Sequence, residues 1–123
     1  MRVTRRFEKR GLSLFFVLCV LTACSKQESV SANAENGRLL LRQFGCGACH
    51  RIPGVADAQG NVGPPLAGVA RRVYLGGVLP NSRENMARWI RSPKSFDPQT
   101  AMPELQVGEE HARDMVSYLY TLR

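Results

Sequence analysis

The sequence has 123 residues and a formal net charge of +7, and hydrophobic residues make up 44% of it. This length suits one domain of ordinary size and is too short for two domains that fold independently. Neither the hydrophobic fraction nor the charge is extreme enough for a disordered protein. A positive charge is compatible with nucleic acid or an anionic membrane as partner, so its distribution along the chain matters.

Residues 1–23 have the pattern of an export signal. Five basic residues fall within the first ten positions, and residues 12–23 carry no charge. That apolar run is too short to span a bilayer, which needs about 20 residues, but it fits the core of a signal peptide. Its removal would take away five of the 17 basic and one of the 10 acidic residues, leaving a net charge of +3. The basic residues therefore chiefly direct export, and we expect no nucleic acid partner.

The letters LTAC, which end at Cys24, resemble the lipobox of bacterial lipoproteins. The resemblance implies that Cys24 becomes the first mature residue and carries a lipid, which would hold the protein at a bacterial membrane on the periplasmic side of the cell envelope. In an ordinary or uncleaved signal, Cys24 would have no such role. Residues 24–36 contain no large apolar side chain and predict a flexible tether with a reach of roughly 20 Å. The folded domain is then residues 37–123.

Three segments of this domain predict helices. The apolar residues of their buried faces are Leu39, Leu40 and Leu41 in the first, Met86, Trp89 and Ile90 in the second, and Ala112, Met115, Val116 and Leu119 in the third. The last set has the spacing i, i+3, i+4, i+7 of an amphipathic helix. Asn33 or Asn36 is the expected N-cap of the first helix. No alternation predicts a strand, so we expect an all-α fold of three to four helices and long loops.

Cys46, Cys49 and His50 form the motif CGACH. This spacing is typical of covalent haem attachment, in which both thiols bond to the porphyrin edge and the adjacent histidine becomes an axial iron ligand. Three other interpretations remain open at this point. They are a disulfide of an exported protein, a thioredoxin-like redox pair, and a zinc site completed by the distant His111.

A haem site needs further residues, and the chain offers candidates. Met102 lies in a polar loop bounded by prolines, where core packing does not explain it, whereas Met86 and Met115 belong to helical patterns. Met102 is therefore the expected sixth ligand. The Pro64 carbonyl, on a rigid turn, suits the acceptor that orients a ligating histidine. Residues 51–81 form an unusually long loop, which a bound haem explains by supplying a core.

In this order and at these separations, CGACH, GPPL and the proline-bounded Met-Pro pair resemble a class I cytochrome c. The resemblance covers residues 34–122. It implies one haem c attached through two cysteines, with His50 as proximal ligand, Met102 as distal ligand and Pro64 as carbonyl partner of His50. It also implies that the two terminal helices cross, with Gly37 at the crossing.

The stretch from residue 69 to residue 103 is most similar to the haem c domain fused to the second subunit of some haem-copper oxidases. No copper domain precedes it here. This similarity implies that Arg72 lies near a haem propionate and that Trp89 lies against the haem. Ordinary packing in the core is the alternative explanation for Trp89.

The predicted function is that of a monomeric, membrane-anchored carrier of single electrons and not of an enzyme. Its expected partners are a terminal oxidase or a quinol-oxidising complex. The alternative is a haem subunit, a peroxidase-like enzyme or a gas-binding protein with a displaceable Met102. A docking patch could be formed by Arg88, Arg91 and Lys94. We predict instead that these basic residues form a solvated helix face, in which Glu84 pairs with Arg88 at i, i+4.

Overall fold

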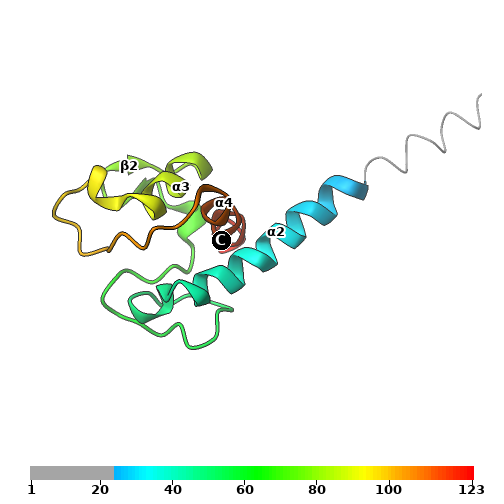
Figure 1. Ribbon diagram of the computed structural model, residues 1–123, viewed down its shortest axis with the longest axis horizontal. Coiled ribbons are helices and arrows are strands. Elements are labelled where there is room, and N and C mark those ends of the chain that lie inside the picture. Colours follow the sequence, from blue (N-terminus) through cyan, green and yellow to red (C-terminus); the bar gives the residue numbers. More distant parts are fainter. Residues whose placement is uncertain (1–23) are drawn as a thin grey trace, which may run out of the picture.

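The computed structural model describes residues 24–123 and confirms the predicted fold of a few helices joined by long loops (Figure 1). The predicted signal peptide lies outside the described residues. The helices of the described residues are α2 (Cys24–Gln43), α3 (Arg83–Arg91) and α4 (Glu109–Leu119), and the strands are β1 (Tyr74–Leu75) and β2 (Leu79–Pro80). Three short 3-10 turns are η1 (Cys46–Ala48), η2 (Val69–Arg71) and η3 (Pro93–Ser95). None of the described helices is long and apolar enough to cross a membrane.

The first helix is longer than the sequence predicts. α2 begins at Cys24, so the backbone of residues 24–36 is helical and not the expected flexible coil. No glycine or proline interrupts this stretch, and extending an existing helix costs far less than starting one. The N-caps predicted at Asn33 and Asn36 are therefore wrong, because both residues lie inside the helix. The domain boundary at residue 37 and the role of the preceding residues as a tether stay predictions.

The crossing of α2 and α4 organises the domain (Figure 1). A Cβ atom on Gly37 would overlap the backbone carbonyl of Asp114, so the two helices approach each other too closely for any side chain there. The side-chain amide of Asn36 donates to the Asp114 carboxylate at 2.6 Å beside this point. Gly37 is thus at the crossing, as the resemblance implies.

One cluster of buried apolar side chains holds the helices and loops together. Its members are Leu40, Leu41, Ile52, Val55, Ala58, Val69, Leu75, Met86, Ile90, Val107, Ala112, Met115, Val116 and Leu119. All four apolar residues predicted for the last helix are in it, and so are Met86 and Ile90 of α3. Leu39 is half exposed instead, since it lies on the outer side of α2.

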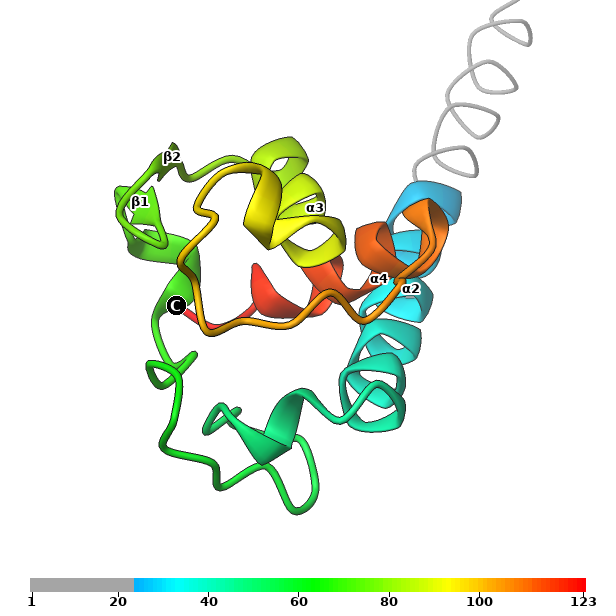
Figure 2. The same ribbon diagram turned by 60° about the vertical axis from the view of Figure 1, so that its left-hand side comes forward.

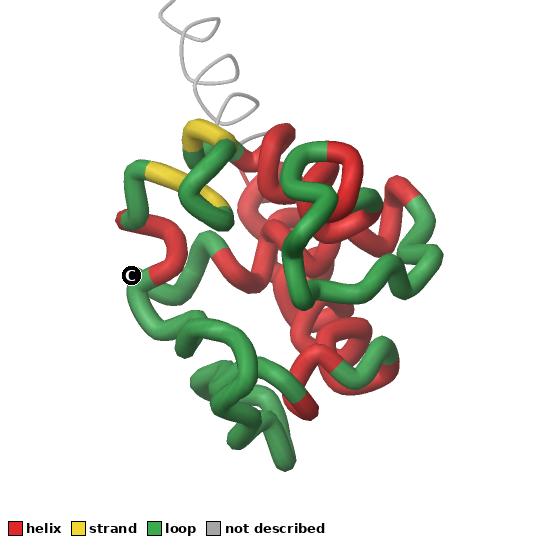
Figure 3. Tube along the Cα trace, turned by 90° about the vertical axis from the view of Figure 1, so that its left-hand side faces the viewer, coloured by secondary structure: helices red, strands yellow, loops and turns green. Residues whose placement is uncertain are grey.

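A short hairpin interrupts the long loop, where the sequence predicts no strand (yellow in Figure 3). β1 and β2 are antiparallel, with Tyr74 opposite Pro80 and Leu75 opposite Leu79. Each strand has only two residues, which is too few to show a period-2 pattern in the sequence. The rest of residues 51–81 consists of turns, bends and the short turn η2, so the expected long loop is otherwise present.

Candidate haem site

The two cysteines of the motif lie on the short turn that follows α2. Cys46 and Cys49 are partly buried and are not joined in a disulfide, which leaves both thiols available. Burial raises the pKa of the Cys46 thiol, which keeps it protonated. The backbone amide of His50 donates to the Cys46 carbonyl at 3.0 Å, so the motif folds into a tight turn.

His50 is held by the loop that follows it. Its Nδ1 donates to the Pro64 carbonyl oxygen at 2.8 Å, the contact that the resemblance implies. The amide of Gly63 donates to the Cys49 carbonyl at 2.9 Å and so fixes this loop against the cysteine turn. A side chain on Gly63 would overlap the His50 ring. With Nδ1 engaged, Nε2 is the nitrogen left to bind a metal.

Arg72 lies beside the same loop. Its guanidinium donates to the carbonyl of Pro65, next to the residue that accepts from His50. The Asn81 side-chain amide donates to the carbonyls of Arg72 and Val69 at 2.8 and 2.9 Å, which ties Arg72 to the base of the hairpin. The arginine is therefore placed to support the turn that orients His50.

The loop that carries Met102 faces the cysteine turn. In Figure 2 the segment after η3, in orange, runs above the segment after η1, in green, and α4 lies behind the orange segment. Hydrogen bonds shape this loop: the Gln99 amide donates to Asp97 Oδ1 at 3.0 Å, and the Met102 amide donates to Thr100 Oγ1 at 3.3 Å. Met102 is half-buried and belongs to none of the helices, which agrees with a role other than core packing.

Trp89, which the resemblance places against the haem, belongs to α3. It is half-buried and packs against the apolar cluster. Its ring lies directly under the hairpin turn, because a side chain on Gly76 would overlap it. The sequence did not predict this contact, because a pair of glycines indicates a turn but not which side chain packs against it.

The alternative interpretations of the cysteine motif do not match this arrangement. Within residues 24–123, no group of three or more histidine, cysteine, aspartate or glutamate side chains comes together to hold a metal ion. His111 is exposed at the start of α4, with its ring edge-on to Phe44 at 5.8 Å between centroids. Two free thiols, one imidazole with a single free nitrogen and one thioether are the donor set of haem c and not that of zinc.

The basic residues of α3 differ from their expected pairing. Arg88 bonds to Asn85 at 3.4 Å and stacks on the Phe96 ring at 5.0 Å, and no ion pair joins it to Glu84. Arg91 lies 3.7 Å from Glu109 of α4. The expected i, i+4 pair is therefore wrong, because Arg88 contacts Asn85 and Phe96 instead, and Arg91 contacts Glu109.

Comparison with known proteins assigns the chain to a family. The family model for cytochrome c matches residues 34–123, which include the whole site described above. The chain therefore belongs to the cytochrome c family, and specifically to the class I c-type cytochromes. These are haem electron carriers, and haem c is bound covalently through Cys46 and Cys49.

Three known proteins are similar to this chain in sequence. Cytochrome c-552 of Bradyrhizobium diazoefficiens is 32% identical over 115 residues, which are 93% of this chain and 94% of that protein. Cytochrome c oxidase subunit 2 of Bacillus sp. (strain PS3) is 28% identical over 94 residues, and that of Bacillus subtilis is 29% identical over 104. These matches cover 73% and 80% of this chain but only 26% and 29% of the oxidase subunits, so the chain spans little more than a quarter of their length.

Proposed function

We propose that the protein is a membrane-anchored mono-haem cytochrome c that carries single electrons in a respiratory chain, to or from a terminal oxidase or a related redox complex. The observation that carries this proposal is the cysteine turn, on which two free thiols adjoin an imidazole held by the Pro64 carbonyl. The similarity to oxidase subunits supports the choice of partner.

Each residue of the site then has a defined role. Cys46 and Cys49 would attach the porphyrin covalently, while His50 and Met102 would bind its iron. Haem iron supplies a one-electron change of valence when bound. The Pro64 carbonyl accepts a hydrogen bond from Nδ1 of His50 and so keeps the ring oriented.

Two further residues complete the site. Arg72 would compensate the charge of a propionate, and Trp89 would cover one side of the haem. Since His50 and Met102 would both bind the iron, small molecules would reach it only if Met102 were displaced. The chain therefore favours electron transfer over substrate chemistry.

The ligand assignment is tested with Met102→Ala. Loss of the thioether removes the sulfur-to-iron absorption of the ferric protein and opens a coordination position, so the ferrous variant binds carbon monoxide rapidly while the wild type resists it. Met86→Ala is the matched control, because Met86 is buried in the apolar cluster. Survival of the sulfur-to-iron absorption in Met102→Ala would refute the assignment. Rapid carbon monoxide binding by the wild type would favour the gas-binding or peroxidase-like alternative.

The anchor is a separate part of the proposal. The sequence around Cys24 supports lipidation, and a lipid there would hold the domain at the periplasmic side of a bacterial membrane. We expect a Cys24→Ser variant to move from the membrane fraction to the soluble periplasmic fraction with an unchanged haem spectrum. Equal membrane retention of variant and wild type would contradict the lipid anchor.

A further inference from the structure

The hairpin is apolar on both of its faces. Leu75 is 6% exposed and, with Leu79, faces the core. Because side chains alternate along a strand, Tyr74 and its partner Pro80 share the opposite face, and so does Val78. In an antiparallel pair that packs on the core by one face, the other face is normally polar. We therefore expect this outer face to contact another molecule and not only water.

The apolar residues of this face are well exposed. Tyr74 is 56% exposed and Val78 is 47% exposed, and Val73 at the base of the hairpin is 74% exposed. We call Val73, Tyr74, Val78 and Pro80 the outer hairpin patch. No charged residue occurs from Val73 to Ser82. Contiguous exposed apolar residues of this kind mark surfaces at which another molecule binds.

The patch is held on a rigid support. Gly76 and Gly77 turn the chain with φ angles of 55° and 77°, which favour glycine, and this places the turn on the Trp89 ring. The Asn81 amide donates to the Val73 carbonyl at 2.9 Å and closes the base of the hairpin. A surface that is already ordered loses little conformational entropy when a partner binds it.

Arginines flank the patch along the chain. Arg71 and Arg72 precede Val73, and Arg83 follows Ser82. The Arg83 guanidinium lies 4.4 Å from the Tyr120 ring centroid, and Arg72 bonds to a backbone carbonyl. Since Arg72 is assigned to a haem propionate, the rim consists of Arg71 and Arg83, and neither forms an ion pair in the part of the chain that the structure describes. An apolar centre with a basic rim complements a partner whose apolar residues are surrounded by carboxylates.

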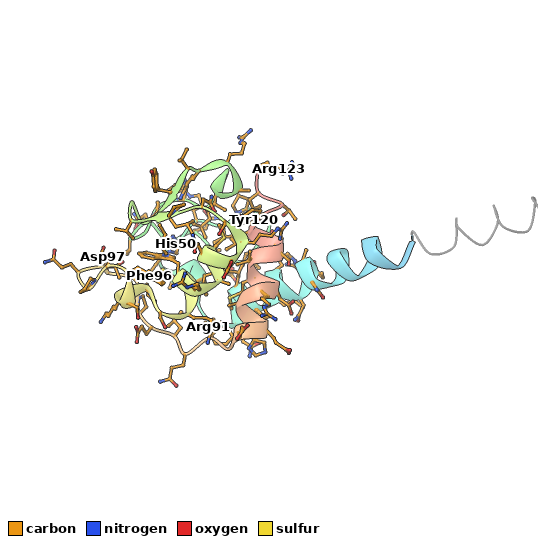
Figure 4. All side chains as sticks on the ribbon, turned by 90° about the horizontal axis from the view of Figure 1, so that it is seen from above. His50, Arg91, Phe96, Asp97, Tyr120 and Arg123 are labelled. Atoms are coloured by element: carbon orange, nitrogen blue, oxygen red, sulfur yellow. The ribbon has the colours of Figure 1, made fainter. Side chains whose placement is uncertain are left out.

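The position of the hairpin favours a protein partner over a lipid surface. The hairpin lies on the side of the domain away from the beginning of α2, and Asp97 lies on that side too (Figures 1 and 4). A lipid on Cys24 would hold the opposite side at the bilayer, so the patch would face away from it.

We propose that the outer hairpin patch is the docking surface for a terminal oxidase that accepts the electron. This rests on the proposed function as an electron carrier. In the complex, one electron leaves ferrous iron and reduces one metal centre of the acceptor by one electron, and no proton or bond changes. A patch of a few side chains suits the small interfaces of transient electron-transfer complexes, below about 1,200 Å² in total.

The experiment uses the full-length holoprotein with Tyr74→Ser and Val78→Ser combined. The reduced protein is mixed rapidly with a detergent-solubilised haem-copper oxidase that has no haem c of its own, or with ferricyanide. We expect the second-order rate constant with the oxidase to fall about tenfold or more, while ferricyanide oxidises variant and wild type equally fast. Leu39→Ser and Val62→Ser, at side chains 51% and 72% exposed elsewhere, are the matched controls and should leave both rates unchanged.

Arg71→Glu tests the rim and remains informative if the double variant does not fold. It should slow the oxidase reaction and weaken its dependence on ionic strength. Equal oxidase rates for wild type and both patch variants would overturn the docking proposal. Weaker binding of the double variant to anionic lipid vesicles, with an unchanged oxidase rate, would overturn it in favour of a membrane surface. A wild type that exchanges electrons with ferricyanide but not with the oxidase would overturn the choice of partner. Failure with ferricyanide would refute the electron-carrier proposal itself.

Discussion

Single hydrogen bonds connect the cysteine turn to the rest of the domain. The His50 ring bonds to the Pro64 carbonyl at 2.8 Å, and the Tyr118 hydroxyl of α4 donates to the Pro53 carbonyl at 2.6 Å. The second bond joins the last helix to the loop that leaves the haem motif. It spans 65 residues of sequence, so it forms only when the helices have packed.

The hydrogen bond of the Tyr118 hydroxyl makes the stability of the fold depend on pH. Burial raises the pKa of the Tyr118 hydroxyl above its usual value of 10.0, so the folded state prefers the neutral phenol. Its contribution to stability is complete below about pH 10 and is lost as the pH rises through the raised pKa. We expect Tyr118→Phe to lower the free energy of unfolding by about 0.5 to 1 kcal/mol at neutral pH. Above pH 10, its stability should fall less steeply with pH than that of the wild type.

Tyr74→Phe is the matched control, because Tyr74 is 56% exposed on the hairpin. Denaturant titrations of both variants at several pH values make the comparison. The same steep loss above pH 10 in Tyr118→Phe and in the wild type would contradict the role given to this hydroxyl. Tyr120, whose pKa burial also raises, is present in all three proteins and accounts for part of the slope that remains.

At the scale of elements, the close approach of α2 and α4 has the largest structural consequence. Gly37 lies within α2, where alanine would favour the helix by about 1 kcal/mol. A methyl group there would overlap the Asp114 carbonyl, which is backbone and cannot rotate away. Helix propensity therefore predicts that alanine at position 37 stabilises the protein, whereas the close helix crossing predicts that it destabilises the protein.

We expect Gly37→Ala to destabilise the protein by about 1 to 3 kcal/mol, since overpacking outweighs helix propensity. Asn33→Ala, at an exposed position of the same helix, should be neutral or slightly stabilising. Thermal unfolding followed by circular dichroism compares the two variants with the wild type. An increase in stability on Gly37→Ala would show that the helices cross elsewhere.

At the scale of the whole molecule, the apolar core is small for the length of loop it must order. Much of the chain between His50 and Ser82 lacks regular structure, and the hairpin that interrupts it has only two residues in each strand. Small domains seldom bury enough apolar surface by themselves to offset the entropy of such loops. Covalently bound haem c adds a large apolar surface to the interior.

We therefore expect a Cys46→Ser, Cys49→Ser double variant, which cannot attach haem covalently, to lose cooperative folding. Without bound haem it should show reduced helical circular dichroism and no sharp thermal transition, because the loops lose the group they surround. A variant with only Cys24→Ser keeps the attachment site and serves as control. A cooperative transition in the haem-free double variant, with a midpoint near that of the wild type, would contradict this expectation.

The sequence shows the candidate haem residues more clearly than it shows the local geometry. The cysteine motif, the proline turn and Met102 are patterns of adjacent residues, so composition and spacing reveal them. The start of α2, the hairpin and the partners of Arg88 were not predicted correctly. The strands are too short to show a period, the extension of α2 has no apolar pattern to reveal it, and the partners of Arg88 follow from how side chains pack.

The sequence by itself determined the chemistry of this protein. Two thiols, an imidazole and a thioether at these spacings suit haem c, and covalent attachment depends on a local motif that needs no knowledge of the fold. The tertiary structure decided the contacts around that chemistry, and it alone showed that the hairpin turn lies on Trp89. It brought Pro64 to His50, Gly37 to Asp114 and the hairpin turn to Trp89, because contacts across many residues follow from packing. The same packing left one face of the hairpin apolar and exposed, which is why a docking surface became visible only in the folded molecule.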